Sequence, residues 1–124
     1  MTTPARSTTG PQDGRPTVAA MRVSVQQLLG PEAELPTVAQ LETLTLRLRG
    51  YAMQLIPAVE SSAGRLPEDD VPRACALACV GEARMRLNAE PRSGLPAGIS
   101  FAQSLARCVN ALCDHVENLV GGHS

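Results

Sequence analysis

Apolar residues recur at helical spacing in four segments of the chain, and residues that favour helix ends bound each segment. In the first segment Thr17 can act as an N-cap, and apolar residues follow it at intervals of three and four up to Leu29. The pair Gly30-Pro31 should end this helix, because glycine favours the position after a helix and proline cannot continue one. The pattern predicts a short helix that needs a neighbour to be stable.

The second segment begins at Thr37, which has capping-box spacing to Gln40. Its apolar residues form one stripe along the helix: Leu41, Leu44, Leu48, Ala52, Leu55 and Val59. Pro57 lacks a backbone donor and clashes with the preceding turn, so we expect the helix to kink or stop near Ile56. A lesser apolar stripe beside the main one consists of Leu46, Met53 and Ile56. This lesser stripe either holds the first helix or forms a surface for a partner.

The third segment follows residues 61–70, which we expect to form a loop with Asp69 or Asp70 as the next N-cap. Its helix has two apolar sides, the first made of Ala74, Ala78, Gly81 and Met85 and the second of Val80 and Leu87. Two apolar sides indicate a helix with neighbours on both flanks. Gly81 costs about 1 kcal/mol of helix propensity relative to alanine. Close packing against a neighbouring backbone is the best explanation for this glycine.

The fourth segment has the cleanest amphipathic pattern. Residues 90–98 should form a loop, after which Ser100 and Gln103 repeat the capping-box spacing and a helix runs to about Val120. Its core stripe is Phe101, Leu105, Cys108, Leu112 and Leu119, and its polar stripe is Gln103, Arg107, Asn110, Asp114 and Glu117. No segment alternates with a period of two. The sequence therefore predicts an all-α fold, a small helical bundle of three long helices plus one short N-terminal helix.

The ends of the chain differ in composition from the helical part. Residues 1–16 contain almost nothing apolar, so we predict a disordered N-terminal tail. Residues 17–120 then form a single helical-bundle domain, and residues 121–124 form a disordered C-terminal end. The chain of 124 residues is 44% hydrophobic but only 2% aromatic, so its core must consist of leucine, alanine, valine and methionine.

Charge and hydropathy exclude several classes of partner. The formal net charge is −1 and the arginines are interspersed with acids, so we expect no nucleic-acid partner. No window approaches the roughly 18 consecutive apolar residues of a membrane-spanning helix, and the N-terminus has no apolar segment typical of a secretory signal. We therefore expect a cytoplasmic protein without a membrane partner, whose four cysteines are reduced thiols.

No group of residues has the spacing of a catalytic or metal site. Cys75 and Cys79 lie four residues apart on the third helix, whereas Cys108 is central to the apolar stripe of the fourth and Cys113 falls well away from that stripe. We interpret the cysteines as packing residues and expect no metal and no cofactor. His115 lies at the edge of the same stripe beside acids of the polar stripe, and we interpret it as structural rather than as a general base.

Two stretches carry a resemblance to a known family: LPEDDVPRACALACVGEARMRL (residues 66–87) and LARCVNALCDHVENL (residues 105–119). They resemble a family of small helical proteins of high-GC Gram-positive bacteria described as natural-product biosynthesis proteins of unknown function. The resemblance covers about residues 37–119 and implies a link to secondary metabolism, without catalytic residues. Caps and packing explain four of the shared residues least well: Arg73, Glu82, His115 and Asn118. We expect these four to belong to a functional surface.

These patterns support two classes of function. The first is a non-catalytic accessory or regulatory protein that is linked to natural-product biosynthesis and acts through protein–protein contacts. We expect this protein to be a homodimer. The lesser stripe of the second segment would be its contact surface. The alternative is a small ligand-binding or catalytic helical protein, in which His115, Glu82 and Arg73 would line an apolar pocket for a small molecule. A thiol-based zinc or redox sensor is a third and less favoured hypothesis.

Overall fold

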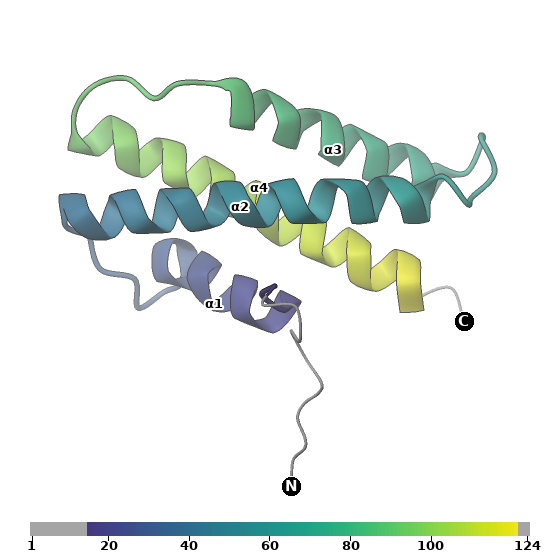
Figure 1. Ribbon diagram of the computed structural model, residues 1–124, viewed down its shortest axis with the longest axis horizontal. Coiled ribbons are helices and arrows are strands. Elements are labelled where there is room, and N and C mark those ends of the chain that lie inside the picture. The colour runs from purple at the N-terminus through teal and green to yellow at the C-terminus, as the bar shows by residue number, and fades with distance from the viewer. Residues whose placement is uncertain (1–14, 122–124) are drawn as a thin grey trace, which may run out of the picture.

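The computed structural model describes residues 15–121, which form a bundle of four helices (Figure 1). They are α1 (Val18–Leu29), α2 (Val38–Ala63), α3 (Val71–Asn88) and α4 (Leu95–Gly121). These residues contain no strand, so the predicted all-α bundle of three long helices and one short helix is confirmed. The predicted disordered ends fall mainly on residues 1–14 and 122–124, which lie outside the described part of the chain.

Helices α2 and α4 form the central pair of the bundle. Helix α1 packs on one side of this pair and α3 on the other, and α1 and α3 do not contact each other (Figure 1). The largest fully buried side chains come from the two central helices and from α1: Met21, Leu48, Leu105, Leu112, Val25, Val59, Val109 and Cys113. None of the described helices is long and apolar enough to cross a membrane.

Side-chain caps start three of the helices where the sequence places them. The Thr17 and Thr37 hydroxyls each accept a hydrogen bond of 3.1 Å from the backbone N–H three residues later. Gln40 completes the capping box, because its side-chain oxygen accepts from the Thr37 backbone N–H at 2.9 Å. The Asp70 carboxylate accepts from the backbone N–H three residues later at 3.0 Å, which identifies Asp70 rather than Asp69 as the N-cap of α3.

Helix α2 does not stop near Ile56 but continues through Pro57 to Ala63. The expectation of a loop beginning at residue 61 is therefore wrong for its first three residues. Pro57 is exposed, so the carbonyl that loses its N–H partner lies on the solvent side of the helix. Beyond the proline, Val59 and Ala63 are fully buried, and burial of their side chains favours continuation of the helix.

Helix α4 begins at Leu95, five residues before the predicted capping box at Ser100. Gly94 has a φ of 101°, a left-handed conformation that favours glycine, and its carbonyl accepts a hydrogen bond from the Gly98 N–H at 3.0 Å. A Cβ atom on Gly98 would lie 2.9 Å from Leu41 Cδ2, so this glycine lets the first turn of α4 approach α2. Tertiary packing thus extends the helix beyond its local capping signal.

Helix α1 is fastened to α4 by Arg22. Its Nη1 atom donates to Asn110 Oδ1 at 2.7 Å, and its Nη2 atom donates to Asp114 Oδ1 at 2.9 Å and to Glu117 Oε1 at 2.7 Å. The hydrogen bond to Glu117 raises the pKa of Arg22 above its ordinary value, so the guanidinium stays charged. Three members of the predicted polar stripe of α4 therefore bind a neighbouring helix instead of facing solvent alone.

Candidate functional site

The side of α3 that points away from the bundle carries a row of apolar residues. Helix α3 packs on α2 and α4 through Ala76, Val80 and Ala83, which are buried. The opposite side is exposed, and Cys75 and Glu82 lie on it beside a row of apolar residues. This row is called the outer face of α3: Val71, Ala74, Leu77, Ala78, Gly81 and Met85. Val71 is 71% exposed and Met85 is 67% exposed. A helix side that faces solvent is normally polar, so this face is unusual for a surface helix.

The expectation that α3 has neighbours on both flanks is wrong for a single chain. The side of α3 with small residues, which the sequence analysis assigned to close packing, is the exposed side. A Cβ atom built on Gly81 would meet nothing within 4 Å, so no part of the described chain requires a glycine at this position. The low helix propensity of Gly81 therefore has no compensating side-chain contact within the described part of the chain.

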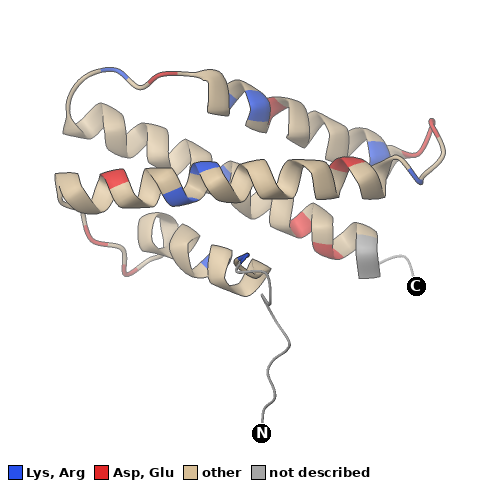
Figure 2. Ribbon diagram, in the orientation of Figure 1, with Lys and Arg blue, Asp and Glu red and all other residues tan. Residues whose placement is uncertain are grey.

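The charged residues that border the outer face are already paired within the chain. Arg84 Nη1 lies 2.7 Å from Glu60 Oε2 of α2, and Arg86 Nη2 lies 3.4 Å from Glu82 Oε2 one turn away. Figure 2 shows blue and red segments on the α3 ribbon with uncharged segments between them. Glu82 is exposed on the same side of the helix as the outer face, so a carboxylate lies directly beside the apolar row.

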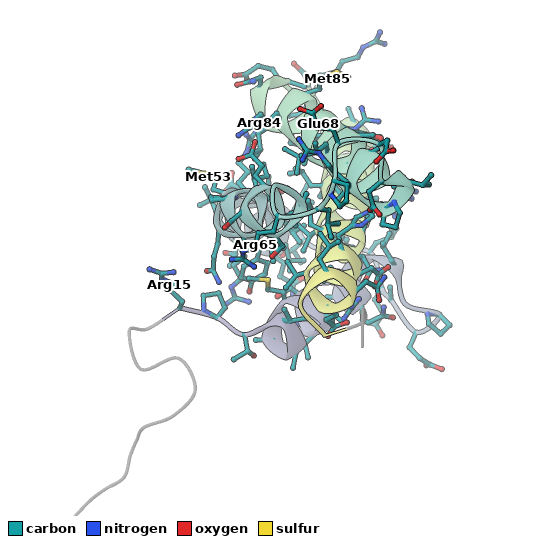
Figure 3. All side chains as sticks on the ribbon, turned by 90° about the vertical axis from the view of Figure 1, so that its right-hand side faces the viewer. Arg15, Met53, Arg65, Glu68, Arg84 and Met85 are labelled. Carbon is teal, nitrogen blue, oxygen red and sulfur yellow. The ribbon has the colours of Figure 1, made fainter. Side chains whose placement is uncertain are left out.

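The lesser apolar stripe of α2 is only partly a surface. Leu46 and Met53 are 71% and 64% exposed, but Ile56 is 5% exposed and belongs to the core. The inclusion of Ile56 in a partner surface is therefore wrong, because its side chain is buried in the hydrophobic core. In Figure 3 Met53 and Met85 point in different directions and Arg84 lies between them. The α2 stripe is thus separate from the outer face of α3.

The four residues singled out by the family resemblance are dispersed. Arg73 is half-buried and its Nη1 donates to the Leu66 carbonyl at 2.9 Å, which fastens the preceding loop. Glu82 is exposed and lies nine residues further along α3, about 13 Å along the axis and on the opposite side of the helix. His115 is half-buried and Asn118 exposed, both on α4. The structure does not bring Arg73 and Glu82 into one pocket.

Cys79 and Cys108 line a cleft of about 240 Å³ between α3 and α4, together with Glu82 and Arg86. Burial raises the pKa of the Cys79 thiol to about 11 and also raises the pKa of Cys108. Such thiols are protonated near neutral pH and are poor nucleophiles and poor metal ligands. The described residues contain no group of three or more histidine, cysteine or acidic side chains that could hold a metal ion.

Cys113 is fully buried, contrary to the expectation that it lies away from the core. Its thiol donates to the Met21 sulfur at 4.0 Å, because α1 covers this side of α4 and widens the buried surface beyond the single predicted stripe. Burial raises the pKa of Cys113 to about 11. This thiol therefore packs between two helices.

We expect one fast-reacting thiol per folded chain in a titration with an aromatic disulfide reagent at pH 8. Cys75 is exposed, whereas a thiol with a pKa of about 11 is only about one part in a thousand thiolate at this pH. A Cys75→Ser variant should lose the fast phase. Two or more equally fast thiols in the folded wild-type protein would contradict the lower exposure and raised pKa of the other three thiols.

A larger cleft of about 720 Å³ lies between α1, the loop after it and the start of α2. Its volume is in the range of small-molecule sites, roughly 300–1,000 Å³. However, Leu35 on its rim is 83% exposed, and its charged residues, Glu32, Glu34 and Arg47, are exposed and of both signs. The cleft therefore lacks the enclosed apolar walls and converging polar groups of a ligand pocket.

Comparison with known proteins places the chain in a family. A family model described as a family of unknown function (DUF6415) matches residues 19–121, which include all four helices except the first residue of α1. The chain belongs to this family. No match is found among curated proteins or among solved structures.

Proposed function

We propose that this member of the DUF6415 family is a non-catalytic accessory or regulatory protein that acts by contacting another protein chain through the outer face of α3. The observation that supports the proposal is the row of exposed apolar residues on a helix whose other side already packs on the bundle. Removal of apolar surface from water is favourable by roughly 25 cal/mol per Å². Contiguous exposed apolar patches accordingly mark interaction sites.

The proposed biological setting is natural-product biosynthesis in the cytoplasm. It is supported by the resemblance of residues 66–87 and 105–119 to proteins of that description, and the first of these stretches contains nearly all of α3. A reducing compartment also suits four free thiols. Deletion of the gene should change the secondary metabolites that the producing strain makes, as measured by mass spectrometry of culture extracts. An unchanged metabolite profile would count against this setting.

Site-specific photo-crosslinking in the producing cells tests the contact surface. A photoreactive amino acid at position 85 should give a covalent protein adduct, because this side chain lies on the outer face of α3. The matched control is the same amino acid at position 53, an equally exposed methionine on α2. We expect a much weaker adduct from position 53. Absence of any protein adduct from position 85 would contradict the proposed function.

A further inference from the structure

We infer that the cleft between α3 and α4 binds a phosphate group through the side chains of Arg86 and Arg107. The cleft has a volume of about 240 Å³, and its charged and hydroxyl-bearing residues are Glu82 and Arg86 of α3 and Ser104 and Arg107 of α4. None of these four residues belongs to the outer face of α3. The inference therefore adds a small-molecule site to the proposed protein contact and does not depend on that contact.

The cleft forms where one edge of α3 adjoins one edge of α4. Glu82 and Arg86 are four residues apart and lie on one side of α3. Ser104, Arg107 and Cys108 are at positions i, i+3 and i+4 and lie on one side of α4. The loop of residues 89–94 turns the chain back, and the two helices pack against each other (Figure 1). Two arginines from different helices thus reach the same cleft.

Arg86 has a buried donor without an acceptor. Its Nε atom is buried, and it is the only buried side-chain nitrogen or oxygen atom of the described residues that has no hydrogen-bond partner. Such atoms are unfavourable and uncommon in native proteins. Its Nη2 atom lies 3.4 Å from Glu82 Oε2, longer than the roughly 2.7–2.9 Å of a strong charge-assisted hydrogen bond. The guanidinium therefore has donors available for an oxygen atom of a ligand.

Arg107 supplies a second guanidinium to the cleft. It is exposed and forms no hydrogen bond or ion pair with another residue of the described chain. Burial and the Glu82 carboxylate raise the pKa of Cys108, and the guanidiniums of Arg86 and Arg107 both act against this increase. Both cations therefore lie near the same thiol in the wall of the cleft. One small anion can reach both of them.

The donors of the cleft match a phosphate group better than a carboxylate. A guanidinium is a planar fork that binds either anion through two parallel N–H···O bonds. The two oxygens of a carboxylate are occupied by one such fork. A phosphate monoester has three terminal oxygens, which can accept from both arginines and from the Ser104 hydroxyl. Two guanidiniums and one carboxylate also leave the cleft with a net positive charge.

The size of the cleft limits the ligand to a small group. Sites that enclose a drug-sized molecule have volumes of roughly 300–1,000 Å³, and this cleft is smaller. It suits inorganic phosphate or the phosphate end of a monoester whose remainder extends into solvent. A dissociation constant of about 1 mM is expected for inorganic phosphate alone.

Nuclear magnetic resonance of the full chain tests the site with inorganic phosphate as the probe. The Nε–Hε signal of Arg86, assigned by its loss in Arg86→Lys, should shift with a saturable dependence on phosphate between about 0.1 and 20 mM at constant ionic strength. Backbone amide signals of residues 104–108 should shift with the same dependence. Absence of a saturable shift in this range would overturn the inference.

Two variants locate the anion, with affinities measured from the amide shifts of residues 104–108. Arg107→Ala should weaken phosphate binding about tenfold or more, because it removes a charge-assisted hydrogen-bond donor. Arg86→Lys keeps the positive charge but lacks the fork, and should weaken binding to a similar extent. Arg47→Ala, which removes an equally exposed arginine of α2, should leave the affinity unchanged. Equal affinities for wild type and Arg107→Ala would overturn the inference.

Glu82→Gln gives a test with the opposite sign. The Glu82 carboxylate lines the cleft and repels an anion bound there, although its side chain is 58% exposed and can turn toward solvent. The variant should therefore bind phosphate about threefold more tightly than wild type. Unchanged or weaker binding would place the anion away from Glu82 and overturn the inference.

A comparison of three anions separates the sources of the ligand. Glycerol phosphate, a monoester, should produce the same shifts as inorganic phosphate if the site accepts the phosphate end of a larger molecule, and no shifts if it accepts only the free ion. Either result supports a phosphate site. Acetate should bind about tenfold more weakly than phosphate, because it occupies only one fork. Equal binding of acetate would overturn the assignment to phosphate.

Discussion

A Leu48→Ala variant is expected to lose about 3 kcal/mol of the free energy of unfolding, because truncation of a fully buried leucine removes apolar contacts and leaves a cavity. Leu48 lies on the buried side of α2, one of the two central helices of the bundle. Small domains have about 5–15 kcal/mol of stability in total, so the loss is a large fraction of it. Urea denaturation followed by circular dichroism at 222 nm measures the change.

The matched control is Leu46→Ala, the same substitution two residues earlier on the same helix. Leu46 is 71% exposed, so its truncation should change the free energy of unfolding by no more than about 0.5 kcal/mol. The two losses of free energy of unfolding differ because Leu48 lies on the side of α2 that faces the core and Leu46 on the side that faces solvent. Equal losses for the two variants would contradict this orientation of α2.

The sequence predicts α2 well because its pattern is long and one-sided. All six residues of the predicted main stripe, from Leu41 to Val59, are buried. Its start is also predictable, since a capping box is a local signal that depends on residues three apart. Its end is not, because burial of Val59 and Ala63 outweighs the local effect of Pro57.

Helix α3 shows where periodicity fails. Both of its sides are apolar, so a pattern of hydrophobic positions cannot determine which side faces the bundle. The structure buries Ala76, Val80 and Ala83 and leaves Met85 and its neighbours exposed. The sequence did indicate that α3 has more apolar surface than one neighbour requires. What it could not show is that α2 and α4 both pack on the same side of α3 and leave the small residues exposed, and this exposed surplus is the basis of the candidate site.

Long-range contacts account for the remaining differences. Cys113 and Arg22 are 91 residues apart, yet both lie at the contact between α1 and α4. No local pattern connects them. The polar stripe of α4 was predicted, but its partner on α1 was missed. One sequence signal could have indicated this partner. Arg22 is the single charged residue of α1 and lies between the buried residues Met21 and Val25.

Replacement of Arg22 by alanine is expected to destabilise the protein by about 1–2 kcal/mol, because three side chains of α4 lose their common partner. An isolated surface ion pair contributes about 0–1 kcal/mol, but here one guanidinium joins two carboxylates and an amide. The arginine side chain is only 29% exposed, which limits screening by water. Helix α1 is short and depends on contacts of this kind to remain docked.

The salt dependence of the effect separates it from a general loss of packing. Asp114 and Glu117 are 56% exposed, so the contribution of the network should weaken as NaCl rises from about 0.05 to 0.5 M and the Debye length shortens. The stability difference between wild type and Arg22→Ala should narrow accordingly, and amide hydrogens of α1 should exchange faster than those of α2 in the variant.

Arg47→Ala, at an exposed arginine of α2, is the control and should alter neither measurement. A stability loss for Arg22→Ala that is independent of salt would mean that the aliphatic part of the side chain, not its charge, holds α1 against α4.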